Sequence, residues 1–161
     1  MIVYQGCIVT FMDQNSLSIL IRLSLFDKIY RNAKRVGEQM RIIDLETGKI
    51  CIFDEIETLF ADAQSLLDGI SDYVYEGCTN FIFKKEHFPE DFYDLKTGLA
   101  GEILQKMTNY RLRVAIIGDF TNIRSNSLLA FILESNRGNQ NFFLSSEEEA
   151  IQILSGQRRL R

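Results

Sequence analysis

From Met40 onward, apolar residues recur with a period of two in some segments and of 3.6 in others, the periods of strands and helices. Residues 41–44 and 50–53 are short apolar segments on either side of the turn signal Glu46-Thr47-Gly48. This pattern predicts a β-hairpin at the start of the body of the chain.

The segment Asp54–Tyr75 has apolar residues at helical spacing and acidic residues on the opposite face. We predict one helix here, started by a capping box of Asp54 and Glu57 and ended at Gly77. The elements after it alternate between strands and helices. We expect the strands at Phe81–Phe83, Arg113–Gly118 and Phe142–Leu144. We expect the helices from Asp91 or Asp94 to Thr108, at Ser125–Asn136 with Gly138 as a left-handed C-cap, and from Ser146, with Glu149 completing a capping box.

The predicted order is therefore β-β-α-β-α-β-α-β-α. Strands that alternate with helices after an initial hairpin indicate an α/β fold with a mixed, mostly parallel sheet. The helices would lie on one face of that sheet or on both. We expect residues 40–161 to form a single domain.

Residues 1–39 have two interpretations. Alternating apolar residues between Leu17 and Leu25 predict a strand, with Ile2–Phe11 as its hairpin partner across Met12–Ser16. Such an added hairpin would extend the sheet or pair two subunits. Alternatively, Met40 is the natural start and the preceding residues belong to an over-long reading frame.

Charge and apolar runs limit the possible partners. Residues 1–39 hold five basic and three acidic residues, whereas residues 40–161 hold thirteen and nineteen. An acidic body disfavours nucleic acid and anionic membranes as partners. The apolar run Ser18–Phe26 contains Arg22 and is too short to span a bilayer, and no secretory signal is recognisable. We expect a soluble, cytoplasmic protein.

The residues that could bind a metal or form a disulfide are few. The three cysteines form no C-x-x-C pair, so we expect neither a disulfide framework nor a zinc site, and we expect a reducing compartment. One histidine, His87, excludes a multi-histidine metal centre, and its charged neighbours predict a surface position. We therefore expect no cofactor.

Candidate functional residues gather at two predicted helix starts. Asp94, Lys96, Thr97, Gly98 and Gly101 lie where the second helix begins. Asp119 follows the central strand, and Ser127 lies at the start of the next helix. Because the carboxyl ends of parallel strands share one edge of a sheet, we expect these polar groups at one rim, where helix N-termini favour an anion.

Each of these residues also has a purely structural interpretation. Asp94 and Thr97 would satisfy the first turn of the helix. Gly98 and Gly101 would permit close packing of the helix on the sheet, Asp119 would turn the chain after its strand, and Lys96 would be solvated. Gly98-Leu99-Ala100-Gly101 is no phosphate-binding loop, since no Gly-Lys-Ser/Thr follows it.

The stretch from Asp91 to Leu154 resembles the uncharacterised bacterial family called domain of unknown function 4180. With a weaker part from Met40, the resemblance covers about three quarters of the chain and leaves out residues 1–39. Leu129-Ala130 departs from the charged pair expected in that family. The resemblance rests on Phe92-x-Asp94 through Lys106, Asn109-Tyr110-Arg111, Ile117–Phe120, Ser127-Leu128, Phe131-Ile132, and the run Glu134-Ser135-Asn136-Arg137-Gly138.

The element order is also similar, more distantly, to that of STAS domains (sulphate transporter and anti-sigma-factor antagonist). In those domains a Ser-Gly-Leu opens the second helix, and phosphorylation of the serine switches partner binding. Thr97-Gly98-Leu99 stands at the corresponding place, although Lys96 replaces a small residue and the preceding acid is displaced by one position. The resemblance implies a phosphorylation switch at Thr97.

We therefore predict a non-enzymatic, STAS-like regulatory or interaction module that binds another cytoplasmic protein or a second copy of itself. Its working face would include the second-helix start, the Asp119 loop and the third helix, with Glu134 and Asn136 at the far end of that helix. The alternative is a small-molecule or nucleotide-binding protein, or a weak enzyme, that uses Asp94, Lys96, Thr97 and Asp119.

Overall fold

The computed structural model describes residues 2–4, 7–9, 33–35, 40–46, 48–54 and 60–156. The chain divides into two compact units, Met1–Ala33 and Lys34–Arg161. In the first unit, β1 (Ile2–Tyr4) pairs antiparallel with β2 (Cys7–Val9). β1 and β2 are thus two strands that pair with each other, whereas the sequence predicts a single strand in this segment. Its predicted partner, residues 17–25, lies outside the described residues.

The second unit contains the predicted hairpin. Strands β4 (Met40–Leu45) and β5 (Gly48–Phe53) pair antiparallel, with Leu45 opposite Gly48. Gly48 has φ of +131°, a backbone conformation that side chains other than hydrogen rarely allow. The turn therefore depends on this glycine, and the hairpin prediction is confirmed.

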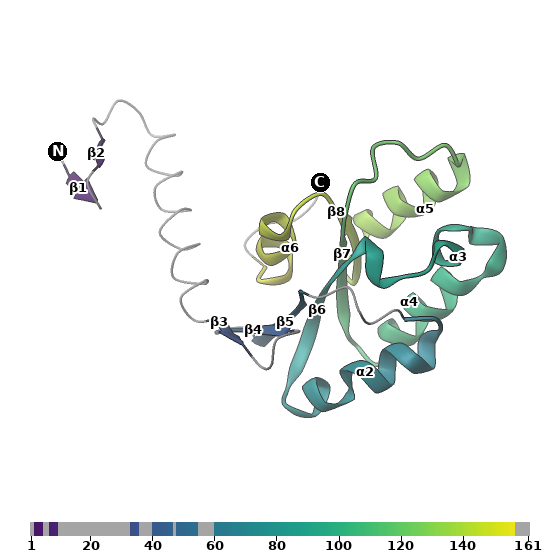
Figure 1. Ribbon diagram of the computed structural model, residues 1–161, viewed down its shortest axis with the longest axis horizontal. Helices are drawn as coiled ribbons and strands as arrows, with labels where there is room; N and C mark the ends of the chain where they lie inside the picture. The colour runs from purple at the N-terminus through teal and green to yellow at the C-terminus, as the bar shows by residue number, and fades with distance from the viewer. Residues whose placement is uncertain are drawn as a thin grey trace. The chain divides into compact units, whose positions relative to one another are not determined.

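The sheet is mixed, as the sequence predicts. Its strand order is β3-β4-β5-β6-β7-β8, with β3 at Ala33–Arg35. From β6 onward, each strand is parallel to the one before it (Figure 1). The three later strands are β6 (Cys78–Lys84), β7 (Arg113–Ile117) and β8 (Asn141–Leu144).

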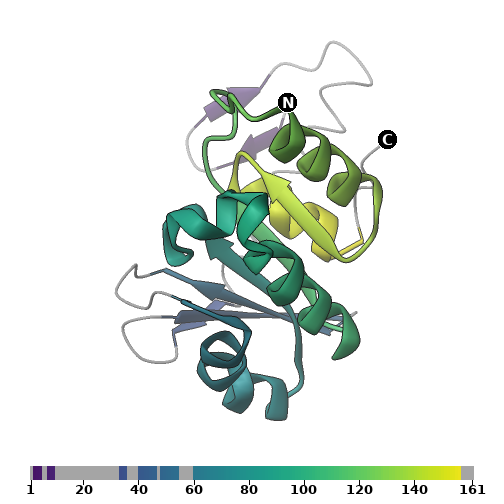
Figure 2. The same ribbon diagram turned by 90° about the vertical axis from the view of Figure 1, so that its right-hand side faces the viewer.

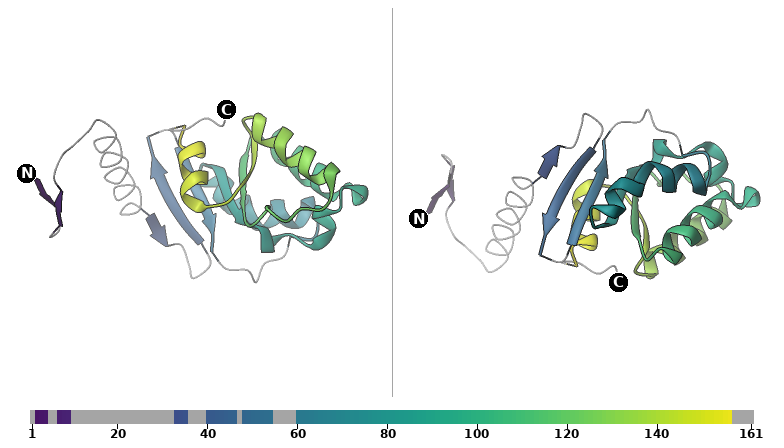
Figure 3. Two further views of the ribbon diagram at one scale, coloured as in Figure 1. Left: turned by 90° about the horizontal axis from the view of Figure 1, so that it is seen from above. Right: turned by 90° about the horizontal axis from the view of Figure 1, so that it is seen from below.

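Helices cover both faces of this sheet, which settles the point that the sequence leaves open. Three helices, α2, α4 and α5, lie side by side on one face, and Figure 2 looks onto that face. Helix α6 lies on the other face, against β6, β7 and β8 (Figure 3). Their bounds are Ala63–Tyr75 for α2, Leu99–Asn109 for α4, Asn126–Arg137 for α5 and Glu147–Leu154 for α6.

The main core lies between the sheet and the three-helix layer. Along β6, Phe81 and Phe83 point into this core and are fully buried. Helix α2 comes close to Phe60, because a Cβ built on Gly69 would lie 3.0 Å from the Phe60 ring. On the other face, Ile151 and Leu154 of α6 are buried, as predicted.

The first long helix starts later than the sequence indicates. Asp54 and Phe60 are not helical, and α2 begins only at Ala63. Asp62 is its N-cap and forms a capping box with Ser65, whose backbone N–H donates to Asp62 Oδ1 at 2.7 Å. The predicted cap at Asp54 is wrong. Its carboxylate accepts hydrogen bonds from Arg41 of β4 at 2.5 and 2.6 Å.

The second predicted helix is broken into three pieces. A short helix, α3 (Glu90–Tyr93), leads into the 3₁₀ turn η2 (Leu95–Thr97) and then into α4. Gly98 separates the last two pieces with φ of +77°, in the left-handed region. By contrast, Gly138 after α5 has φ of −75°, so the predicted left-handed C-cap there is wrong.

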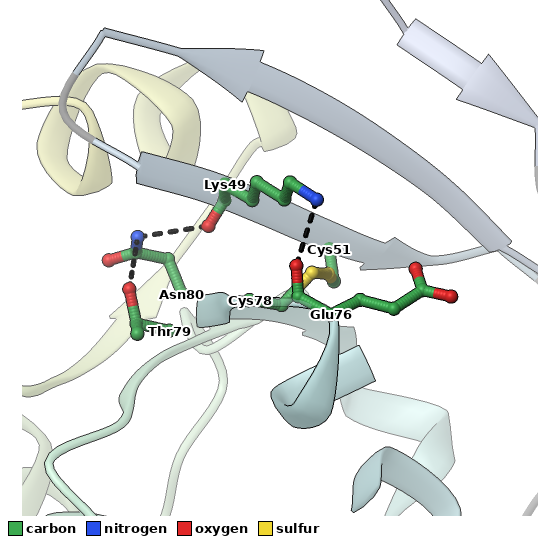
Figure 4. Close-up of a disulfide and its surroundings, with 6 residues drawn as sticks. All are labelled: Lys49, Cys51, Glu76, Cys78, Thr79 and Asn80. Carbon is green, nitrogen blue, oxygen red and sulfur yellow. Dashed lines mark hydrogen bonds between the residues drawn. A yellow bond between two sulfur atoms is a disulfide. The ribbon is translucent and has the colours of Figure 1, made fainter. Parts of the chain in front are cut away.

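Two cysteines form a disulfide, which contradicts the sequence-based expectation. Cys51 of β5 and Cys78 of β6 have their Cα atoms 6.3 Å apart, and their sulfur atoms are bonded between the neighbouring strands (Figure 4). The pairing shifts register between Lys49 and Ile50, so Lys49 faces Cys78 while Ile50 faces Asn80. This irregularity leaves Cys78 on the same face as Cys51, a relation that their spacing along the sequence does not reveal.

Candidate functional site

The polar rim lies where β6 and β7 end side by side. Lys84 pairs with Ile117, which brings the next residues, Lys85 and Gly118, into contact. A Cβ built on Gly118 would lie 2.6 Å from the Lys85 Cβ, a distance that side chains do not tolerate. Glycine at position 118 therefore lets Lys85 pass across the end of β7.

The Lys85 side chain joins the two loops that we expected at one rim. Its ammonium donates to the Asp119 carbonyl oxygen at 3.2 Å and lies 5.6 Å from the Tyr93 ring centroid and 5.5 Å from that of Phe120. The Tyr93 hydroxyl donates to the Lys85 carbonyl oxygen at 2.9 Å. We call these four residues the Lys85 cluster. Lys85 is not among the residues that the sequence pattern indicates, although it follows a buried strand, as Asp119 does.

Burial fixes the protonation state of the tyrosine in this cluster. Loss of hydration, aided by the negative charge of Glu86, raises the pKa of Tyr93 well above its ordinary value of 10.0. The phenol therefore stays neutral even in alkaline solution where an exposed tyrosine ionises. It serves as a hydrogen-bond donor that holds α3 against the η1 turn (Lys85–His87).

Asp119 is exposed, and its side chain organises its own loop. The carboxylate accepts from the Thr121 backbone N–H at 2.8 Å and from the Thr121 hydroxyl at 2.6 Å. These two bonds, with a smaller effect of the Lys85 charge, lower the pKa of Asp119. The residue therefore stays ionised, and its bonds to Thr121 turn the chain after β7.

Asp94, Lys96 and Thr97 are also exposed and shape the η2 turn. Asp94 accepts from the Lys96 backbone N–H at 3.1 Å. The Thr97 hydroxyl lies 2.7 Å from the Asp91 carbonyl oxygen and 2.8 Å from that of Asp94, donates to these acceptors, and accepts from the Leu99 N–H at 3.2 Å. These bonds join residues from α3 to the start of α4, so Asp94 and Thr97 contribute to the backbone turn that starts α4.

Gly98 and Gly101 do not permit close packing of helix and sheet. No described atom lies within 4 Å of a Cβ built on either residue, and both are exposed. Gly98 is explained by its positive φ. Gly101 lies within α4, and no steric contact in the described part of the chain accounts for glycine there.

The three remaining candidates belong to α5 and fall at its two ends. Ser127 lies near the start, where its hydroxyl is 2.9 Å from that of Ser125, the N-cap. Glu134 and Asn136 lie in the last turns of the helix, about 10 to 15 Å along its axis from Ser127. Glu134 is exposed beside Arg137 at 3.4 Å, and the Asn136 side chain binds the backbone of Phe143 in β8. The Asn136 side chain therefore serves to attach the end of α5 to β8.

His87 is buried, so the expected surface position is wrong. Its Nδ1 accepts from the Lys84 backbone N–H at 2.8 Å, and its ring stacks on that of Phe60. The Phe60 N–H in turn donates to the His87 carbonyl oxygen. The η1 turn thus places the ring among the core phenylalanines despite the charged residues that precede it.

Two arginines on the α6 face hold that helix, and the sequence pattern indicates neither of them. Arg41 binds Asp54 and, at 2.9 Å, Glu147 in the first turn of α6. The hydrogen bond to Asp54 is the main cause that raises the pKa of Arg41, so the guanidinium stays charged. Arg113 donates to the carbonyl oxygens of Leu154 at 2.8 Å and Ile153 at 3.2 Å, at the other end of α6.

The described residues offer little for catalysis or metal binding. No three His, Cys, Asp or Glu side chains among them are placed to hold a metal ion. The best-positioned hydroxyl and carboxylate of the rim, on Thr97 and Asp119, bind within their own loops. In the same part of the chain, every helix is too short or too polar to cross a membrane.

Comparison with known proteins gives one match. A model of the family described as "Domain of unknown function (DUF4180)" matches residues 45–154, more than half of the chain. No curated protein and no solved structure matches the chain.

Proposed function

The chain belongs to the DUF4180 family, and from that premise we propose that it is a non-enzymatic regulatory module that binds another protein. The family description gives no activity, so the proposal rests on the surface of the molecule. The resemblance to STAS domains in the β-β-α-β-α-β-α-β-α order supports the same class of function.

One observation carries the proposal: α5 has leucines on both of its sides. Leu128 and Ile132 are buried against the core, as expected for a helix that packs on a sheet. Leu129 and Leu133, four residues apart and thus neighbours on the helix surface, are 43% and 53% exposed. Contiguous exposed apolar surface is a mark of protein-binding sites, and these two adjacent leucines are the apolar surface that α5 offers to a partner.

The rim residues support binding rather than catalysis. A nucleotide or small-molecule site would need Asp94, Thr97 and Asp119 to turn their polar atoms toward one ligand. The contacts of these side chains are local instead, since Thr97 donates to the carbonyl oxygens of Asp91 and Asp94 and Asp119 binds Thr121. Their backbone turns shape the end of the molecule from which α5 starts.

Phosphorylation of Thr97 would regulate this end of the molecule. The modification replaces the hydroxyl hydrogen, which the residue donates to the Asp91 and Asp94 carbonyl oxygens. It also adds a charge of about −1.5 to −2 beside those oxygens. We infer that a phosphate at Thr97 would open the η2 turn and change the surface that a partner meets.

The test is a binding assay with matched variants of the full chain. Candidate partners, including a second copy of the chain, are captured with the wild-type chain. Light scattering then measures the mass of each complex, and calorimetry measures its affinity. Leu129→Lys together with Leu133→Lys should abolish a specific complex, because two charges replace the apolar contact. Tyr75→Lys is the control: Tyr75 is 94% exposed but lies on α2.

The Thr97 switch is measured in the same assay. Thr97→Glu should weaken or strengthen the complex, whereas Thr97→Ser keeps the donor and should leave it unchanged. A complex that tolerates both leucine substitutions would exclude the α5 surface. An unchanged affinity for Thr97→Glu would exclude the switch and leave the α5 surface standing.

A further inference from the structure

Strand β8 ends the strand order of the described sheet, so one of its sides faces no described strand. Its other side pairs with β7: the Val114 N–H donates to the Gln140 carbonyl oxygen at 2.7 Å, and the Gly118 N–H donates to that of Leu144 at 3.0 Å. Backbone groups alternate in direction along a strand. Asn141 and Phe143 therefore direct their N–H and C=O groups away from β7.

Asn136 occupies the outward backbone groups of Phe143. Its Oδ1 accepts from the Phe143 N–H at 2.7 Å, and its Nδ2 donates to the Phe143 carbonyl oxygen at 2.9 Å. A residue of a neighbouring antiparallel strand makes the same two bonds to its partner. The side-chain amide of Asn136, on the last turn of α5, thus makes the two hydrogen bonds that one residue of an adjacent strand would make.

We propose that Asn136 closes the β8 edge and prevents β8 of a second copy from adding to the sheet. Exposed edge strands are templates for pairing with another chain. Two identical edges can pair antiparallel about a two-fold axis, so a second copy is the occupant that this edge would accept first. The proposal is independent of the α5 binding surface.

The two hydrogen bonds to Phe143 give Asn136, one of the candidate residues indicated by the sequence, a structural role at the edge of β8. Phe143 is buried on the core side, 4% exposed, so its backbone position is fixed by its ring. Asn136 is half-buried and follows exposed Glu134 in the same helix. An amide with one donor and one acceptor side by side matches the Phe143 backbone, whereas a carboxylate or a hydroxyl would satisfy only part of it.

The first test uses the wild-type chain and two variants. Amide hydrogen exchange of the wild type should show the Phe143 N–H protected, even though it faces away from β7. In Asn136→Ala, exchange at Phe143 should be about tenfold faster. The average mass from light scattering should rise with protein concentration toward twice that of the wild type under the same conditions. Asn126→Ala, an exposed asparagine at the start of α5, should behave as the wild type.

A second substitution shows whether any new association uses the edge. Asn141→Pro, added to Asn136→Ala, removes an outward N–H at the first residue of an edge strand, where proline is tolerated. It should restore the wild-type mass. The proposal is overturned if the wild-type Phe143 amide exchanges as fast as an exposed loop amide. It is also overturned if the mass of a cooperatively folded Asn136→Ala does not rise, or if association survives Asn141→Pro.

Discussion

At the scale of single residues, two glycines of one helix start have opposite explanations. Gly98 joins η2 to α4 in a left-handed conformation, whereas Gly101 has ordinary helical geometry, is exposed and contacts nothing that a Cβ would disturb. The left-handed conformation costs most residues about 1 to 2 kcal/mol, and glycine inside a helix costs about 1 kcal/mol relative to alanine. The same substitution should therefore have opposite effects at the two positions.

We predict that Gly98→Ala lowers the free energy of unfolding by about 1 to 2 kcal/mol. Gly101→Ala should raise it by about 0.5 to 1 kcal/mol. Urea unfolding of the two variants and the wild type measures both effects, and each variant is the control for the other. Destabilisation by Gly101→Ala would contradict the prediction. It would mean that a Cβ at position 101 disturbs a contact that the described residues do not make.

The candidate site shows what residue patterns can and cannot predict. Strand order alone placed the Asp119 loop at the carboxyl edge of the sheet, where it lies beside Tyr93 and Lys85. The pattern did not show that Lys85 crosses the end of β7, because that crossing depends on the contact with Gly118. It also misplaced His87, whose charged neighbours indicated the surface while the η1 turn directs its ring inward.

At the scale of elements, the sequence predicts which strands and helices exist better than where they begin. Alternating and helical periods identified β4 to β8 and the helices between them. The start of α2 was wrong because Asp54, which resembles a cap, is bound by Arg41, a partner from another strand. The break between η2 and α4 was missed because apolar spacing continues across Gly98.

The disulfide makes a second prediction at this scale. Cys51 and Cys78, separated by 27 residues, close the β5-α2-β6 unit into a covalent loop. Restricting the unfolded chain over a loop of this length stabilises the folded state by about 3 to 4 kcal/mol. Urea unfolding with and without reductant should differ by about this amount.

The double variant Cys51→Ala and Cys78→Ala is the control for this measurement. It retains Cys7 and should unfold at the same urea concentration with and without reductant. If the wild type is equally insensitive to reductant, the two cysteines do not stabilise the protein as a covalent pair. Mass spectrometry after alkylation under denaturing conditions reports the bond directly.

At the scale of the folded unit from Lys34 onward, the two faces of the sheet are held in different ways. The face with α2, α4 and α5 has a core rich in phenylalanine, with Phe81 and Phe83 at its centre. The other face has one described helix, α6, of eight residues. Arginines from two strands bind its two ends, Arg41 at Glu147 and Arg113 at the last carbonyl oxygens.

The charge of each arginine suits the end of the helix that it reaches. Arg41 acts through the acidic first turn, where a carboxylate is favoured by the helix dipole. Arg113 places its guanidinium directly at the C-terminal carbonyls, where a cation is favoured, and also donates to the Asn139 carbonyl oxygen at 3.0 Å. Burial lowers the pKa of Arg113, so these carbonyl oxygens compensate for lost hydration.

We predict that Arg113→Met lowers the free energy of unfolding by about 1 to 3 kcal/mol, because the charge-assisted hydrogen bonds to α6 and the cation–π contact with the Phe142 ring are lost. Amide exchange should accelerate in α6 more than in α2, since only α6 loses its C-terminal partner. Arg124→Met, at an exposed position of the loop before α5, is the matched control and should change neither quantity. Equal acceleration in α2 and α6 would contradict the prediction, because it would mean that Arg113 stabilises the whole sheet rather than the attachment of one helix.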